Sequence, residues 1–334
     1  AQLPSFSNGP APPRPETPLT LAEAVYGFGQ PAPEGAVWQN RDNERHEDGR
    51  YAKFIDEIKS EARIDPKRIY TDAARTFAYG TDASFYRLIP KVVVKVSDED
   101  EVIRILKIAR ENHTPVTFRA AGTSLSGQAC TDSVLIKLSH NGRAWRRYEI
   151  ADEGREVTVQ PGLIGGEVNR LLAGYQKKHK LPTQYKIGPD PASIDSCMIG
   201  GIVNNNSSGM CCGVAQNTYH TLKDLRVVFG DRDATVLDTS DPESRRVFQH
   251  ESPFGKSLCE GVSALAREVQ ADAELTALIN RKFSIKCTTG YAINALVDIS
   301  PDEPVEMIKK LMVGSEGTFG FVSRATYNTV EDYP

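Results

Sequence analysis

The chain has 334 residues, 40% of them hydrophobic and 25% charged, which is typical of globular proteins and not of disordered or coiled-coil chains. Its 40 basic and 44 acidic residues leave no positive excess to attract a nucleic-acid backbone. No stretch approaches the roughly 18 apolar residues that cross a bilayer. We therefore expect no nucleic-acid partner and no transmembrane segment.

The first 37 residues are rich in Pro, Ala, Gly and Ser and show little periodicity. This composition predicts an extended arm, which we assign to residues 1–50. Such an arm is compatible with the remainder of a transit peptide, which favours the mitochondrial matrix, with a bacterial-type cytoplasm as the alternative.

Six cysteines and six histidines are spread along the chain. The cysteines form no CxxC pair and no framework spacing, and the histidines form no pair at helical spacing, so neither pattern is typical of a metal centre. We expect reduced thiols and no zinc or iron-sulfur site within these residues.

The first predicted lobe is small and of α/β type, over about residues 85–142. Its periodicities predict, in chain order, a strand over 91–96, a helix from the acidic cluster at 97–100 to about 112, and strands over 116–119 and 134–138. A further amphipathic helix over 51–62 precedes it. The succession of strand, helix and strand is a β-α-β unit.

A larger second lobe, over about residues 150–330, follows. Its predicted elements are strands over 157–160 and 225–229, helices over 164–175, 255–269 and 273–280, and a turn with a strand over 311–326. The predicted fold class is α+β, with a small α/β lobe followed by a larger mixed-sheet lobe with helices.

Three segments carry candidate chemistry. The first, PVTFRAAGTSLSGQ over 115–128, is a strand that runs into small residues, whose exposed backbone N–H groups suit a phosphate or pyrophosphate. It matches neither the Rossmann nor the P-loop pattern, and a simple turn is the alternative.

The second segment, IGPDPASIDSCMIGGIVNNNSSG over 187–209, crowds glycines, serines and three asparagines between apolar residues. Asparagine and serine side chains bind carbonyls, ring nitrogens or phosphates, and glycine permits close approach, so a large polar ligand accounts for the composition. A long irregular loop that satisfies its own backbone is the alternative. The third segment, GSEGTFGFV over 314–322, reads locally as a tight turn before a strand.

Taken together, these segments resemble the FAD-binding domain of the vanillyl-alcohol oxidase and p-cresol methylhydroxylase superfamily, from about Tyr70 to Thr329. The stretches GPDPAS, IGGIVNNNSSGMCCG, QNTYHTL and GSEGTFGF are most similar to FAD-linked D-2-hydroxyacid dehydrogenases, which include D-lactate and D-2-hydroxyglutarate dehydrogenases. Within that branch, the likeness is to long enzymes that fuse the FAD domain to an iron-sulfur module. The resemblance implies an FAD-binding domain over residues 51–330.

In the resembled family the first segment wraps the pyrophosphate with backbone amides, the second lies along the flavin and ribityl chain, and the third holds the far end of the cofactor. The implied cofactor-binding residues are Arg119, Ala120, Ala121, Gly122, Thr123, Ser124, Ser193, Cys197, Met198, Gly200, Gly201, Asn205, Asn206, Ser208, Glu316, Gly317, Thr318 and Val322. Some members tether FAD through a histidine in the first loop. Here that loop holds Thr123 and Ser124 instead, so we expect non-covalent FAD.

The implied reaction is hydride transfer from the α-carbon of a D-2-hydroxyacid to flavin N5, with reoxidation by a quinone, a cytochrome or an iron-sulfur module outside this chain. In the resembled enzymes a cap domain with the substrate contacts and the catalytic residues come later in the chain, so no catalytic residue is assigned here. The alternative is a flavin-fold domain kept as a structural or assembly component without turnover.

Overall fold

The computed structural model describes residues 49–139 and 144–333. Contacts divide the chain into two units, residues 1–49 and 50–334, and both lobes described below belong to the second unit. The predicted N-terminal arm lies outside the described residues, except for its last two residues, which begin a helix.

The first lobe is a four-stranded sheet of order β1-β2-β4-β3, in which β2, β4 and β3 are parallel and β1 is antiparallel to β2. Its strands are β1 (Ile69–Tyr70), β2 (Val92–Val96), β3 (Val116–Arg119) and β4 (Val134–Leu138), and its helices are α2 (Gly49–Ser60), α3 (Ala73–Ala78) and α4 (Glu99–Glu111), with the short 3-10 helix η1 (Pro66–Arg68). The predicted β-α-β unit is confirmed, because β2 runs through α4 to the parallel strand β3. The lobe also includes elements ahead of the expected range of 85–142.

Local sequence explains why α4 forms where predicted. The Asp98 carboxylate accepts the Glu101 N–H at 2.9 Å and caps the helix, and acidic residues fill the first turn, where the helix dipole favours them. Val102, Ile105 and Leu106 lie on one face at spacings of three and four residues, and all three are buried.

The second lobe is built on a five-stranded sheet of order β5-β6-β10-β8-β9. The strands are β5 (Tyr148–Ala151), β6 (Glu156–Val159), β8 (Leu222–Phe229), β9 (Val236–Asp238) and β10 (Gly320–Asn328), beside a separate pair β7 (Tyr185–Lys186) and β11 (Val330–Glu331). Every neighbouring pair is antiparallel, so the expected mixed sheet is wrong for this lobe. The reason is topological: β10, the central strand, returns from the C-terminal end of the chain to lie antiparallel between β6 and β8.

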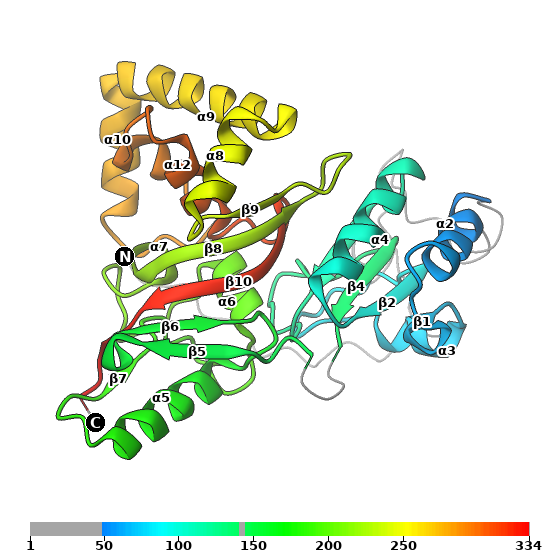
Figure 1. Cartoon of the computed structure of the whole chain (residues 1–334), viewed down its shortest axis with the longest axis horizontal. Coiled ribbons are helices and arrows are strands. Elements are labelled where there is room, and N and C mark those ends of the chain that lie inside the picture. The colour runs from blue at the N-terminus through cyan, green and yellow to red at the C-terminus, as the bar shows by residue number, and fades with distance from the viewer. Residues whose placement is uncertain (1–48, 140–143, 334) are drawn as a thin grey trace, which may run out of the picture. The chain divides into compact units, whose positions relative to one another are not determined.

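Helices cover the second lobe: α5 (Gly165–His179), α6 (Ile199–Asn205), α7 (Thr218–Thr221), α8 (Pro242–His250), α9 (Pro253–Ala271), α10 (Ala273–Phe283), α11 (Ala295–Asp298) and α12 (Pro304–Met312), with the 3-10 turn η2 (Asp152–Gly154). Figure 1 shows α8, α9, α10 and α12 gathered beyond the β8–β9 edge and α5 beside β5 and β6. The helices predicted over 164–175, 255–269 and 273–280 are confirmed as α5, α9 and α10. Among the described residues, no helix combines the length and apolarity needed to span a bilayer.

The two lobes share buried side chains at their junction. Phe321 of β10 packs against Phe118 and Trp145, with ring centroids 5.2 Å apart in both pairs, and the Trp145 indole N–H donates to the Val96 carbonyl at 2.8 Å. The Arg226 guanidinium pairs with the Glu99 carboxylate at 2.8 Å across the same junction. These contacts fix the loop that leaves β3 relative to the loop that enters β10.

Candidate functional site

A cavity of about 880 Å³ lies where the two lobes meet, in the size range of pockets that hold drug-sized or larger ligands. Four stretches of chain line it, around residues 118–129, 191–208, 288–290 and 316–322. Three of them are the segments that the sequence singles out. Residues far apart in the chain therefore converge on one concave surface, which favours a binding site over three independent turns.

The loop after β3 presents free backbone donors to this cavity. Gly122 has a φ of 78°, a conformation that favours glycine, and its carbonyl accepts the Ala83 N–H at 2.9 Å. Within the described part of the chain, the N–H groups of Gly122, Thr123 and Ser124 donate to no other residue. A turn with several unpaired amides lining a cavity is suited to an anion such as a phosphate.

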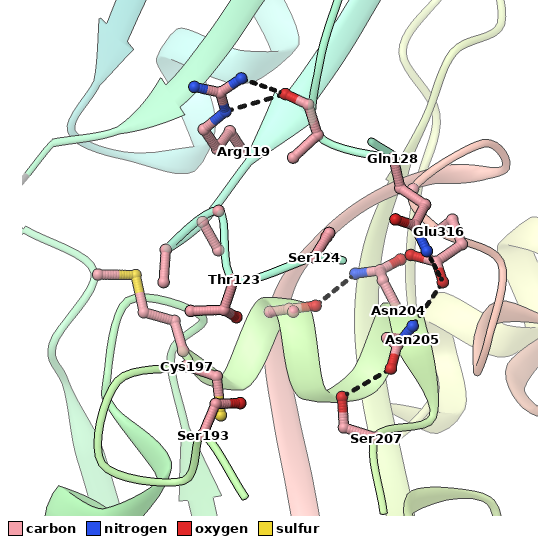
Figure 2. A pocket seen from close by; sticks show the side chains of 18 of the residues that line it. Arg119, Thr123, Ser124, Gln128, Ser193, Cys197, Asn204, Asn205, Ser207 and Glu316 are labelled. Carbon is pink, nitrogen blue, oxygen red and sulfur yellow. Dashed lines mark hydrogen bonds between the residues drawn. The ribbon is translucent and has the colours of Figure 1, made fainter. Parts of the chain in front are cut away.

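Arg119, at the end of β3, borders the cavity, but its guanidinium is bound to the protein backbone. Its side chain is buried, and its guanidinium donates to the carbonyl of Ala129 at 2.9 Å (Figure 2). It also donates to the carbonyls of Tyr79 at 2.9 Å and Thr81 at 3.0 Å. Burial lowers the pKa of this guanidinium. The structure gives Arg119 the role of anchoring the loop, because its donors are already committed to backbone carbonyls.

The second segment contains helix α6, where the sequence predicts only irregular chain. Gly200 packs so closely that a Cβ there would stand 2.9 Å from Cβ of Pro161, whereas a Cβ on Gly201 would meet no heavy atom within 4 Å. Gly201 lines the cavity, so the absence of a side chain leaves room for a ligand against the helix. The Ser208 hydroxyl, also in the lining, is buried and has no partner among the described residues.

The third segment docks on the end of α6. The Gly314 and Glu316 N–H groups donate to the carbonyls of Val203 and Asn204, at 3.1 and 2.7 Å. The Glu316 carboxylate accepts the Asn205 side-chain amide at 2.6 Å and lies 3.4 Å from the Gln128 amide, so it joins all three segments (Figure 2). Burial raises the pKa of Glu316. The Glu316 carboxylate therefore fixes the mutual position of the three segments.

Among the described residues that line the cavity, Cys197 carries the one thiol and there is no histidine. The side chain is buried, and burial raises the pKa of the thiol above its ordinary value. A protonated, buried thiol is a weak nucleophile. In the described residues no group of three or more metal-ligating side chains gathers, so the donors around the cavity are amides, hydroxyls and backbone groups.

The structure brings most of the predicted cofactor residues together. The cavity is lined by Arg119, Ala120, Ala121, Gly122, Thr123, Ser124, Ser193, Cys197, Met198, Gly200, Gly201, Asn205, Ser208, Glu316, Gly317 and Val322. Asn206 and Thr318 lie outside the lining. The Asn206 side chain accepts the Tyr219 N–H at 3.1 Å, and the Thr318 hydroxyl donates to the Ser315 carbonyl at 2.7 Å, so both stabilise the turns beside the cavity.

Sequence reasoning missed one whole stretch of the lining, Thr288, Thr289 and Gly290. It follows α10 and has the same small and polar character as the other segments, which is the signal that was available. Sequence reasoning also missed Pro161, which buttresses α6, and Gln128, which lies 3.4 Å from Glu316.

Residues 90–240 match the FAD binding domain family. The match contains the first two of the three segments that line the cavity. The chain is 26% identical over 285 residues to the D-2-hydroxyglutarate dehydrogenase of Pseudomonas putida, a match that covers 84% of this chain and 26% of that enzyme. It is 33% identical over 148 residues to the glycolate oxidase subunit GlcD of Bacillus subtilis, covering 43% of this chain and 29% of that subunit. The predicted resemblance to p-cresol methylhydroxylase-type FAD-binding domains is confirmed.

One solved structure has a fold similar to that of this chain. Alkyldihydroxyacetonephosphate synthase superposes with a TM-score of 0.51 at 15% identity, over 84% of this chain and 44% of that chain, which is a likeness of fold alone. The chain spans about a quarter of the length of the Pseudomonas putida dehydrogenase.

The residues of the cavity fit FAD. The unpaired amides from Gly122 to Ser124 suit a diphosphate, and the open space at Gly201 admits a planar ring system against α6. The buried Ser208 hydroxyl, which has no partner among the described residues, offers one donor and two acceptor sites to a polar ligand.

Proposed function

We propose that the complete protein is an FAD-dependent oxidoreductase that takes a hydride from the α-carbon of a D-2-hydroxyacid, and that this chain is its FAD-binding part. The observation that carries the proposal is the convergence of three cofactor-type segments on one cavity of sufficient size. The names of the relatives supply the substrate class. 2-Hydroxyglutarate and glycolate both carry a hydroxyl on the carbon next to a carboxylate.

Bound FAD supplies the hydride acceptor in such a reaction, while the protein supplies binding and orientation. In this proposal the amides of residues 121–124 hold the diphosphate. Gly201, Asn205 and Ser208 line the path of the ring and its ribityl chain. Glu316 fixes the positions of the cofactor-binding segments relative to one another, because its carboxylate accepts the Asn205 amide and lies close to the Gln128 amide. Orientation of this kind contributes to rate by fixing the distance between the reacting atoms.

The proposal includes dissociable FAD. Cys197 carries the thiol among the described residues of the lining, and burial raises its pKa and keeps it protonated. The electron acceptor of the complete protein is proposed to be a quinone, a cytochrome or an iron-sulfur module.

The test begins with the purified chain and FAD. Flavin absorption should appear on reconstitution, and acid precipitation should release all of the yellow colour into the supernatant. The complete protein should then be reduced by D-2-hydroxyglutarate, D-lactate or glycolate under anaerobic conditions, with the L enantiomers of the first two as controls. A chain that takes up no FAD contradicts the proposal and favours a structural role. Equal reduction by the L enantiomers contradicts the assigned stereochemistry.

A further inference from the structure

Three cations occupy neighbouring register positions on the sheet of the first lobe. Lys95 of β2 pairs in register with Lys137 of β4, and Lys137 pairs with Arg119 of β3. Paired residues of adjacent strands project to the same face of a sheet. All three stand near the carboxyl ends of parallel strands, where β3 runs into the small-residue loop that lines the cavity.

Placing these three cations side by side lowers the stability of the folded chain without a ligand. Lys137 and Arg119 are 9% and 5% exposed, and like charges on neighbouring strands repel each other. Within residues 49–139 and 144–333, none of the three cations forms an ion pair with a carboxylate. Lys137 and Arg119 donate to backbone carbonyls, and the Lys95 ammonium lies 5.0 Å from the ring centroid of Tyr70. A net positive charge is therefore held behind the loop.

Lys137 also sets the orientation of that loop. Its ammonium donates to the Ala120 carbonyl at 3.0 Å. Because a trans peptide is planar, with its C=O and N–H on opposite sides, the N–H of Ala121 points away from Lys137. Ala121 lines the cavity, and its N–H donates to no other residue of the described structure. A cation on the carbonyl also polarises the peptide and strengthens the opposite N–H as a donor.

We infer that Lys137 is the positioning residue of the diphosphate loop: it turns the Ala121 amide toward the ligand and, with Arg119 and Lys95, supplies the positive charge that makes this cavity bind nucleotides with a diphosphate in preference to a flavin without one. This inference rests on the proposed function. It goes beyond that function because it assigns the choice of ligand to three cations that do not contact the ligand directly. Lys137 and Lys95 lie outside the cavity lining, and Arg119 donates to backbone carbonyls.

The protonation of Lys137 agrees with this assignment. Burial, and then the charges of Arg119 and Lys95, lower its pKa from 10.5 to about 8. The other titratable groups around these three cations are Tyr70 and Tyr79 beside Lys95, and Asp82 and Cys130 beside Arg119. A bound diphosphate stabilises the protonated form, so its affinity should fall as the pH rises above about 8, by at most about tenfold per pH unit.

The experiment compares Lys137→Met with wild-type chain, using FAD, ADP and riboflavin as probes. Methionine keeps most of the side-chain volume and removes the charge. Lys310→Met is the matched control, because Lys310 is partly buried, also has a pKa lowered to about 8 and also donates to a backbone carbonyl, that of Leu222 at 3.1 Å, but lies outside the cavity lining.

We expect Lys137→Met to raise the Kd for FAD and for ADP by about tenfold or more, the equivalent of one charge-assisted hydrogen bond. Riboflavin binding should be unchanged, and Lys310→Met should bind all three probes as the wild type does. Unchanged ADP and FAD affinity in Lys137→Met overturns the inference and leaves the proposed function standing. A wild-type chain that binds neither FAD nor ADP overturns both.

Two further measurements, one of them on the wild-type chain alone, complement the titration of the variant. In the wild-type chain the Kd for ADP should rise between pH 7.5 and 9.5, and thermal unfolding of Lys137→Met without ligand should occur at a temperature equal to or above that of the wild type. A merely structural lysine would lower that temperature and leave the pH profile flat. An ADP affinity that is independent of pH overturns the inference.

Discussion

Gly201 separates binding from folding more cleanly than any other position in the lining. It lies inside helix α6, and a Cβ built on it meets no heavy atom within 4 Å. Glycine inside a helix costs about 1 kcal/mol relative to alanine. Gly201→Ala should therefore increase the free energy of unfolding of the chain without ligand by about 0.5–1 kcal/mol.

The same methyl group projects into space that the ligand is proposed to use, since Gly201 lines the cavity. Overfilling a packed contact costs about 1–3 kcal/mol, and each 1.4 kcal/mol is a factor of ten in Kd. Gly201→Ala should weaken FAD binding by about tenfold, and Gly201→Leu should abolish it while keeping the fold. Stability and affinity thus move in opposite directions in a single variant.

Urea unfolding and FAD titration on the same samples check both halves of this prediction. Gly174→Ala is the control, because Gly174 lies in α5, also has no heavy atom within 4 Å of its added Cβ, and is absent from the lining. It should gain the same stability with no change in affinity. Normal FAD binding by Gly201→Leu would refute the placement of the cofactor against α6.

Three further outcomes follow from the polar contacts. Glu316→Ala should raise the Kd for FAD about tenfold, because it removes the acceptor of the Asn205 amide and the neighbour of the Gln128 amide. In the same titration Glu316→Gln should bind FAD nearly as the wild type does. Arg119→Met should lower the free energy of unfolding in urea by about 3 kcal/mol or more, because three backbone carbonyls lose their donor. Burial lowers the pKa of Lys310 from 10.5 to about 8, so between pH 8 and 10.5 the unfolded chain binds one more proton than the folded chain. The free energy of unfolding therefore rises with pH in this range, by up to about 3 kcal/mol from this group. Unfolding curves of Lys310→Met from pH 7.5 to 10 should lack that part of the rise, and an identical slope would contradict the assignment.

The elements of the first lobe were predictable because their signals are local. β3 and β4 have the bounds expected from the sequence, and α4 begins at its acidic cluster. The order β2-β4-β3 was not predictable, because it depends on which strand pairs are stable together. Pairing across a sheet leaves no mark in the sequence spacing of the strands.

Two missed helices show how composition can hide periodicity. In α6, Ile199, Ile202 and Val203 are buried at spacings of three and four, but two glycines and two asparagines favour a loop when each residue is weighed alone. In α12, a proline in the first turn precedes Val305, Ile308 and Met312, all buried on one face. In both cases tertiary burial of one face outweighs weak local propensity.

The site was predictable as a set of segments but not as a set of roles. Arg119 and Thr123 stand four residues apart in one loop, yet the first donates to backbone carbonyls and the second lines the cavity with a free amide. Sequence cannot separate them, because the direction of a side chain at the end of a strand depends on the pairing of that strand.

Several local rules of stability are broken around the cavity. Lys137 and Arg119 place like charges side by side in a buried sheet, Glu316 holds a partly buried carboxylate at a φ of 53°, and Gly201 weakens a short helix. Each departure lowers the stability of the unliganded chain, and each is relieved or used when an anionic, planar ligand enters. A domain kept only for assembly gains nothing from these departures, so their presence around the cavity supports the proposed FAD binding.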